Sequence, residues 1–234
     1  GQILGMLPRD AKNMKILIVK LGALGDVLRT TPLLTALKAA HPLSEIVWVV
    51  EKANADVLSG NSLIDEVLSW SEETLHELSR RSFDWAINLD KEPEALEAIS
   101  KASAKQKAGF GRSKEGNLAP LDRLSDYAYR LGLDDELKFK LNRKTYQEIS
   151  FEQAGLVFEG EEYVFPVGGG RGFVETLPKK WPLVGIHTGS GKRFAGKKLP
   201  LETCVRLTQK FLQSGAGVFN NSATSELLVF EVQN

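Results

Sequence analysis

The sequence predicts an α/β protein built on a doubly wound parallel sheet. The runs at 15–21 and 45–50 are short and mostly apolar, as expected of strands that are buried on both faces. A helical stretch with apolar residues at 33, 34, 37 and 40 follows the first run. Strands and helices then continue to alternate along the chain. This alternation is typical of a parallel sheet with helices on both sides.

The first predicted strand ends in glycines, and the loop 22–26 leads into the first helix. Two helix starts are plausible: Thr31 as the capping residue with Pro32 in the first turn, or Asp26 as the cap. The later elements follow in order. We predict further strands at 45–50, 66–70, 83–90 and 107–110, helices at 53–58, 72–81, 93–104, 121–131 and 145–154, and a polar surface loop at 111–120.

A glycine-rich segment, 168–172, is the best candidate linker, because the α/β pattern restarts after it. The restarted pattern comprises a strand at 183–187, a loop, a helix at 201–213 and the start of a strand at 217–219. We therefore predict an N-terminal domain at 14–166, a linker at 167–180 and a partial second Rossmann-like domain at 181–234. Two doubly wound domains of ordinary size would need roughly 300 or more residues, and the chain has 234.

Composition excludes several classes of protein. The chain has 30 Lys and Arg against 30 Asp and Glu, so it lacks the overall positive charge typical of nucleic-acid binding. Cys204 is its single cysteine, which rules out an internal disulfide and fits a reducing compartment. No run approaches the roughly 18 apolar residues of a membrane span. We expect a cytoplasmic protein.

Ligands of open parallel sheets gather outside the carboxyl ends of the strands, which selects the loops 21–31 and 187–200. In the first loop, Gly22 and Gly25 allow a tight turn beside a helix start. This G-x-x-G-D sequence lacks the three glycines of the dinucleotide fingerprint. Asp26 has two interpretations of equal weight: a helix cap, or a general base that accepts a proton from a substrate hydroxyl.

The second loop contains Thr188, Gly189 and Ser190, and lysines and arginines follow them. Hydroxyls, free N–H groups and cations before a helix suit a diphosphate. The alternative is a solvated basic loop, and the Walker A pattern is not met. His187 lies at a strand end, where a ligand contact and a structural role are equally plausible. No D-x-D, H-E-x-x-H or C-x-x-C motif is present, so no metal site is expected.

Three segments make the sequence similar to a known family. The segments are KILIVKLGALGDVLRTTPLLTALK at 15–38 with EIVWVVEK at 45–52, KTYQEISFEQAGLVFEGEEYVFP at 144–166, and VGIHTGSGKRFAGKKLPLE at 184–202. Together they resemble the heptosyltransferases of glycosyltransferase family 9, which build the lipopolysaccharide inner core. The spacing of Gly25, Asp26 and Pro32 matches the family, and the resemblance extends from residue 14 to about 219.

The resemblance implies a GT-B architecture, in which the first domain binds the acceptor and the second binds the nucleotide-sugar. It implies an inverting, metal-independent transfer of heptose from ADP-heptose to a core sugar hydroxyl, with no cofactor. Asp26 matches the catalytic aspartate and Lys197 the lysine that contacts the diphosphate, although Leu199 replaces the tryptophan of that element. Peripheral contact with the inner membrane would follow from a lipid-linked acceptor.

Charge and loop position make further residues candidates within this scheme. Arg29 and Arg112 are candidates for holding an anionic acceptor, and residues 188–190 would stabilise the departing diphosphate.

Two other functions stay open. One is an NAD-binding oxidoreductase, because Glu51 ends the second strand much as a ribose-binding acid would. Against it, Glu51 lies 29 residues beyond Gly22, farther than the roughly 20 of the fingerprint. The other is a non-catalytic binding module. If the chain ends at Asn234, half the donor site is lacking, and we expect weak or no transfer activity.

Overall fold

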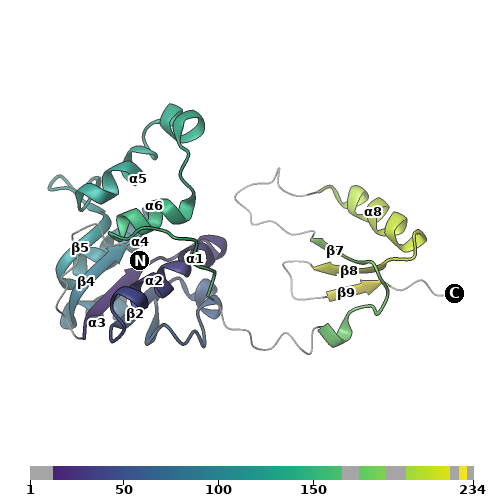
Figure 1. Ribbon diagram of the computed structural model, residues 1–234, viewed down its shortest axis with the longest axis horizontal. Coiled ribbons are helices and arrows are strands. Elements are labelled where there is room, and N and C mark those ends of the chain that lie inside the picture. Colours follow the sequence, from purple (N-terminus) through teal and green to yellow (C-terminus); the bar gives the residue numbers. More distant parts are fainter. Residues whose placement is uncertain (1–12, 165–173, 188–198, 222–226, 231–234) are drawn as a thin grey trace. The chain divides into compact units, whose positions relative to one another are not determined.

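The computed structural model describes residues 13–164, 174–187, 199–221 and 227–230. The chain divides into two compact units, Gly1–Pro166 and Val167–Asn234, each of which is considered by itself (Figure 1). Part of the predicted linker, 167–173, lies outside the described residues. The acceptor and donor roles of the two predicted domains stay predictions.

The first unit is built on a six-stranded sheet with the strand order β3-β2-β1-β4-β5-β6. Neighbouring strands from β3 to β5 run parallel, and β6 pairs antiparallel with β5 at the edge. The predicted α/β class with a parallel-dominated sheet is therefore confirmed. The strands are β1 (Lys15–Val19), β2 (Glu45–Val50), β3 (Glu66–Ser69), β4 (Ser82–Asn88), β5 (Ser103–Arg112) and β6 (Leu118–Pro120).

The continuous apolar character of β1 follows from burial on both faces of the sheet. Ile16 and Ile18 belong to one hydrophobic core, whereas Leu17 and Val19 belong to another. Alternate side chains of a strand point to opposite faces, so both faces of this strand need apolar residues. The first core includes side chains of α2 (Pro32–Ala40) and α6 (Tyr146–Gln153), and the second those of α3 (Glu72–Arg80) and α4 (Pro93–Lys101).

The first helical region begins earlier than either predicted cap. Helix α1 (Leu24–Thr30) has Ala23 at its N-cap, and α2 follows directly after Thr31. The start predicted at Thr31 is confirmed for α2, which has Thr31 at its N-cap and Pro32 in its first turn, whereas the start predicted at Asp26 is wrong. The Thr31 side chain makes no capping hydrogen bond. Its hydroxyl donates to Leu28 O (2.8 Å), and α1 and α2 are separated here because Pro32 has no N–H to continue the helical ladder.

Part of the loop predicted at 111–120 is in fact a hairpin, because β5 extends to Arg112 and pairs with β6. Gly109 allows β5 to pass the end of β4. Its φ is +87°, and an added Cβ would lie 1.9 Å from Asn88 O, so no larger residue fits. Gly109 N donates to Asp122 Oδ2 and to Ser125 Oγ, both at 3.0 Å.

The remaining elements of this unit lie near the predicted positions. The helix expected at 121–131 is split into η2 (Arg123–Ser125) and α5 (Asp126–Arg130), and the one expected at 53–58 is a 3-10 helix, η1 (Lys52–Val57). A π-helical turn, η3 (Leu137–Leu141), follows α5. Thr145 and Glu148 form a capping box at the start of α6, which explains why that helix begins where its sequence predicts.

The second unit contains a three-stranded sheet, β7-β8-β9, and one long helix. Strands β7 (Leu183–His187) and β8 (Gly217–Asn221) are parallel, and β9 (Leu227–Phe230) pairs antiparallel with β8. Helix α8 (Leu201–Gln213) packs Cys204 against Ile186 and Val218. Strand β8 continues beyond the predicted strand start at 217–219 and ends at Asn221. It is paired with β7 on one side and with β9 on the other.

Candidate active site

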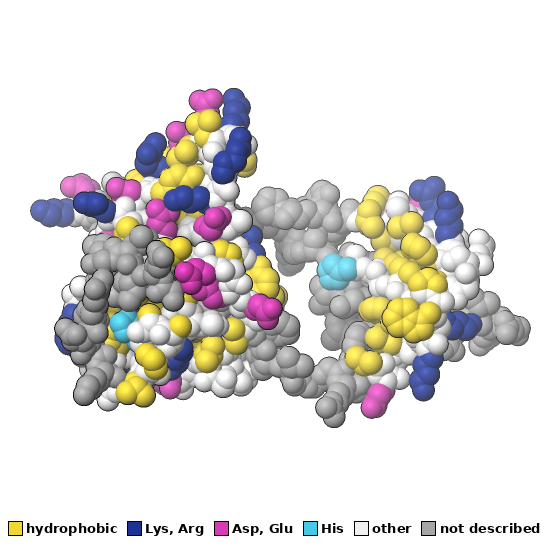
Figure 2. All heavy atoms as spheres, viewed as in Figure 1, with side chains coloured by type: hydrophobic (Ala, Val, Ile, Leu, Met, Phe, Trp, Pro, Cys, Tyr) yellow, Lys and Arg dark blue, Asp and Glu magenta, His cyan; other side chains and the backbone are white. Residues whose placement is uncertain are grey.

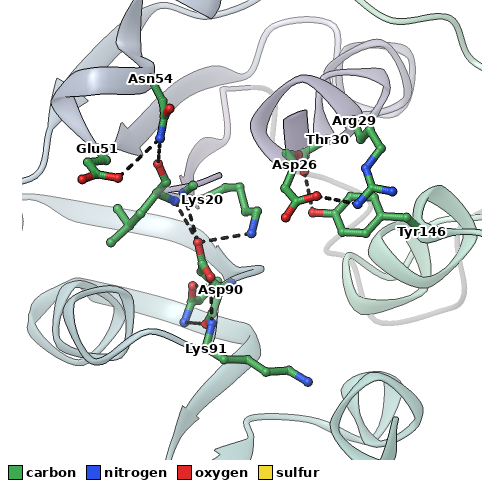
Figure 3. A network of polar contacts seen from close by, with 12 residues as sticks. Lys20, Asp26, Arg29, Thr30, Glu51, Asn54, Asp90, Lys91 and Tyr146 are labelled. Atoms are coloured by element: carbon green, nitrogen blue, oxygen red, sulfur yellow. Dashed lines mark hydrogen bonds and ion pairs between the residues drawn. The ribbon is translucent and has the colours of Figure 1, made fainter. Parts of the chain in front are cut away.

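The candidate site lies at the carboxyl edge of the first unit's sheet, where the strand order reverses. Strand β1 lies between β2 and β4. The chain first adds β2 and β3 on one side of β1 and then crosses to add β4 on the other side. Such a topological switch point is where open α/β sheets bind ligands. The loop 20–23 after β1 and the turn 89–91 after β4 meet there (Figure 3).

Asp90 holds the loop after β1 in place. Its Oδ2 atom accepts hydrogen bonds from Leu21 N and Gly22 N, both at 3.2 Å, and lies 3.2 Å from Lys20 Nζ. The side chains of Lys20 and Asp90 are only 6% and 11% exposed, so their charges compensate each other away from water. Asp90 is thus the centre of a buried polar network that fixes the backbone next to α1 (Figure 3).

The opposite side of the same loop is held by Asn54 from η1. Asn54 Nδ2 donates to Leu21 O (2.8 Å), and Glu51 N donates to the same oxygen (3.1 Å). An added Cβ on Gly22 would lie 3.1 Å from Asn54 Nδ2 and 3.5 Å from Glu51 Oε2. The close approach of these side chains explains why glycine suits position 22.

Asp26 lies in the first turn of α1, immediately after this fixed loop. Its side chain is 38% exposed and forms an ion pair with Arg29. No side-chain cap was found for α1, so the carboxylate is not used to satisfy the helix terminus. Asp26 therefore presents a partly exposed carboxylate near the switch point, and its role as a general base stays a prediction.

Tyr146 of α6 holds the other side of Arg29. The Arg29 guanidinium carbon lies 4.2 Å from the centre of the Tyr146 ring, and the Tyr146 hydroxyl lies 3.0 Å from Thr30 Oγ1. Thr30 Oγ1 also donates to Asp26 O (2.8 Å). Residues far apart in sequence thus orient the Asp26–Arg29 pair, which Figure 3 shows beside Tyr146.

The other predicted acceptor residue, Arg112, has a different setting. It ends β5, and its Nη1 atom donates to Gly116 O (3.0 Å) within the exposed β5–β6 hairpin. Arg112 thus donates a hydrogen bond to a backbone carbonyl of the hairpin, whereas Arg29 forms an ion pair with Asp26. The structure brings Arg29 and Asp26 together and gives Arg112 a separate contact.

The predicted diphosphate loop belongs to the second unit and is not described. Thr188, Gly189, Ser190 and Lys197 all lie outside the described residues. The described residues that flank this loop in the sequence are His187, which ends β7, and Pro200, which directly precedes α8. Their roles stay predictions.

Lys91 is a further charged residue at this edge that the sequence interpretation did not single out. Its Nζ atom donates to Ala128 O (3.2 Å) and lies 4.7 Å from the centre of the Phe110 ring. Burial lowers the pKa of Lys91, and the nearby charges of Lys138 and Lys20 lower it further. Lys91 could have been found from the sequence, because it directly follows the strand predicted at 83–90 and ligands bind outside the carboxyl ends of parallel strands.

Comparisons with known proteins connect this fold to one class of enzyme. No protein-family model matches the chain. Three solved structures each match 88% of the chain. A family 9 glycosyl transferase from Veillonella parvula has a TM-score of 0.62 and 21% sequence identity. Escherichia coli ADP-heptose lps heptosyltransferase II has a TM-score of 0.60 and 16% identity, and Escherichia coli heptosyltransferase WaaC with ADP has a TM-score of 0.56 and 17% identity. The structural neighbours are therefore glycosyltransferases, and the fold is the GT-B type of the heptosyltransferases.

Sequence comparison also finds heptosyltransferases, over a shorter length. Lipopolysaccharide heptosyltransferase 1 of Salmonella typhimurium is 42% identical over 55 residues, and that of Escherichia coli K12 is 40% identical over 55. These matches cover 24% of this chain and 17% of each relative. The chain also spans only 62%, 64% and 65% of the three structural neighbours.

Within the described residues, no group of three or more His, Cys, Asp or Glu side chains is arranged to hold a metal ion. None of the helices in that part of the chain is long and apolar enough to cross a membrane.

Proposed function

We propose that the protein is a heptosyltransferase that moves a heptose from ADP-heptose to a sugar hydroxyl of the lipopolysaccharide inner core. The observation that carries the proposal is the accessible Asp26 carboxylate, held at the sheet's switch point in a fold shared with heptosyltransferases. One of those neighbours was solved with ADP and with ADP-2-deoxy-2-fluoro heptose, which supports a nucleotide-sugar as donor. The acceptor would bind to the first unit and the donor to the second, in the cytoplasm at the inner face of the inner membrane.

The proposed reaction is a single displacement with inversion. The acceptor oxygen forms a bond to the anomeric carbon of the heptose as the bond from that carbon to the diphosphate breaks. Asp26 takes the hydroxyl proton, and it helps most as charge develops in the oxocarbenium-like transition state. One carboxylate suffices, because no covalent sugar–enzyme intermediate is formed.

The leaving nucleoside diphosphate needs its own stabilisation. We assign that role to backbone N–H groups and hydroxyls at Thr188, Gly189 and Ser190 and to the ammonium of Lys197. Arg29 would bind an anionic group of the acceptor, because its half-exposed guanidinium lies next to the base. Arg112 would contact a more distant part of the acceptor. No cofactor or metal is required in this scheme.

The stereochemistry of the product tests the proposed reaction. With the full-length protein, ADP-heptose and a truncated core acceptor, NMR should show an anomeric configuration opposite to that of the donor. Transfer should persist in excess EDTA. Retention of configuration would contradict the single displacement, and loss of activity with EDTA, restored by a divalent cation, would contradict metal independence.

One observation favours a second candidate, an NAD-binding oxidoreductase. Glu51 lies at the end of β2 beside Gly22, close to where a ribose-binding acid would be expected in a dinucleotide site. The third glycine of that fingerprint is still lacking, which makes this the weaker candidate. A non-catalytic nucleotide-binding module would share the fold and differ only in lacking transfer.

A further inference from the structure

The chain between α5 and α6 contains a segment, residues 131–141, that extends away from the sheet. We call it the projecting segment, and Figure 1 shows it beyond α5. Residues 132–136 and 138–141 are all exposed. Only Leu131 and Leu137 are partly covered. The segment includes η3, the π-helical turn, and is not packed as a layer of the fold.

This exposed segment is rich in large apolar side chains. Leu133 is 68% exposed, Phe139 is 72% exposed and Leu141 is 62% exposed. Among the described residues, the four hydrophobic clusters include none of the segment's five large apolar side chains. Burial within this unit therefore does not explain them. A concentration of exposed apolar residues marks a surface that contacts another partner.

Basic residues lie close in sequence to these apolar side chains. Lys138, Lys140 and Arg143 are exposed, and Lys138 Nζ lies 4.9 Å from the centre of the Phe139 ring. Between residues 130 and 144 the sequence has five basic and three acidic residues. Two of the acids have partners nearby: Asp134 Oδ1 accepts from Leu137 N (2.8 Å), and Glu136 pairs with Lys140 (3.7 Å). Figure 2 shows hydrophobic, basic and acidic side chains together on this projection.

We propose that the projecting segment docks on an anionic lipid surface. Leu133, Phe139 and Leu141 would enter the boundary between headgroups and acyl chains, while Lys138 and Arg143 would contact lipid phosphates. Insertion of apolar side chains and attraction of basic ones together give the two signals that stable peripheral binding needs. A symmetric contact between two copies is disfavoured, because it would bring the same basic residues together.

The segment also borders the candidate active site. An added Cβ on Gly132 would lie 2.7 Å from Lys91 Nζ, so the segment's beginning contacts the turn after β4. Docking through 133–141 would therefore bring the carboxyl edge of the sheet close to the lipid. This suits an acceptor anchored in a membrane, although lipid binding does not depend on transfer and can be measured without it.

Vesicle sedimentation of the purified chain tests the proposal. We expect binding to vesicles of phosphatidylethanolamine with about one third phosphatidylglycerol, and at least roughly tenfold weaker partitioning onto pure phosphatidylcholine. Raising NaCl to about 0.5 M should weaken the binding, because the charged contacts are screened. Absence of binding to the anionic vesicles would overturn the proposal.

Variants locate the contact. The double substitution Phe139→Ser and Leu141→Ser should lower partitioning by about tenfold or more, since both inserting side chains are lost. Leu43→Ser is the matched control: Leu43 is also 68% exposed but precedes β2, at the amino edge of the sheet, and its loss should leave binding unchanged. Circular dichroism would verify folding of each variant.

Two further outcomes would overturn this assignment. In the first, the double variant binds anionic vesicles as tightly as the unmodified chain does, which would exclude the projecting segment as the contact. Alternatively, sedimentation velocity could show a dimer that the double substitution abolishes while vesicle binding is absent, which would assign the surface to a second copy.

Discussion

Replacement of Asp90 by alanine is expected to lower the free energy of unfolding of the first unit by about 3–5 kcal/mol. The substitution leaves the Lys20 ammonium buried with no carboxylate, because the two side chains are only 6% and 11% exposed. It also removes the acceptor of Leu21 N and Gly22 N. Denaturant unfolding followed by tryptophan fluorescence measures the effect, and Trp48, whose indole N–H donates to Lys20 O, lies next to the change.

An exposed ion pair provides the control. Lys15 and Glu45 are 3.4 Å apart with side chains 55% and 46% exposed, so Glu45→Gln should cost less than about 1 kcal/mol. Combining Asp90→Ala with Lys20→Met should recover part of the loss, since no unpaired charge remains. If Asp90→Ala costs no more than Glu45→Gln, the buried network does not hold the loop.

The substitution Asp26→Asn should reduce sugar transfer by about 10²–10⁴-fold in the full-length protein, with nucleotide affinity unchanged. Asparagine has nearly the same shape and cannot accept the proton from the acceptor hydroxyl. Because the donor is assigned to the second unit, its binding should not need this carboxylate. Initial rates of transfer and calorimetry with ADP measure the two quantities separately.

Asp56→Asn is a suitable comparison, because Asp56 is exposed on η1 and is also an aspartate in the first unit. Its transfer rate should equal that of the unmodified protein. Near-normal turnover by Asp26→Asn would show that another group accepts the proton. A parallel loss of ADP binding would instead indicate a structural defect.

Local sequence patterns predicted the strands well for a physical reason. Residues 16–19 and 46–50 are apolar at every position, as expected of strands that are buried on both faces of a parallel sheet. Capping was harder to predict. Asp26 has the right chemistry for a helix cap, yet the backbone begins α1 two residues earlier and the carboxylate pairs with Arg29.

The polar network could not be predicted from sequence, because its members are far apart in the chain. Asp90 contacts Leu21 and Gly22 only once β1 and β4 are adjacent, which is a property of the strand order. Tyr146 reaches Arg29 by the docking of α6 against α1. The exposure of Phe139 likewise depends on which surfaces the rest of the fold already covers.

The most direct test of the transferase proposal is a calorimetric titration with ADP, UDP and NAD in parallel. ADP should bind, UDP more weakly, and NAD should give no heat of binding, because the G-x-x-G-D loop lacks the dinucleotide fingerprint and ADP is the product of the proposed donor. Binding of NAD without binding of ADP would contradict the account and favour the oxidoreductase.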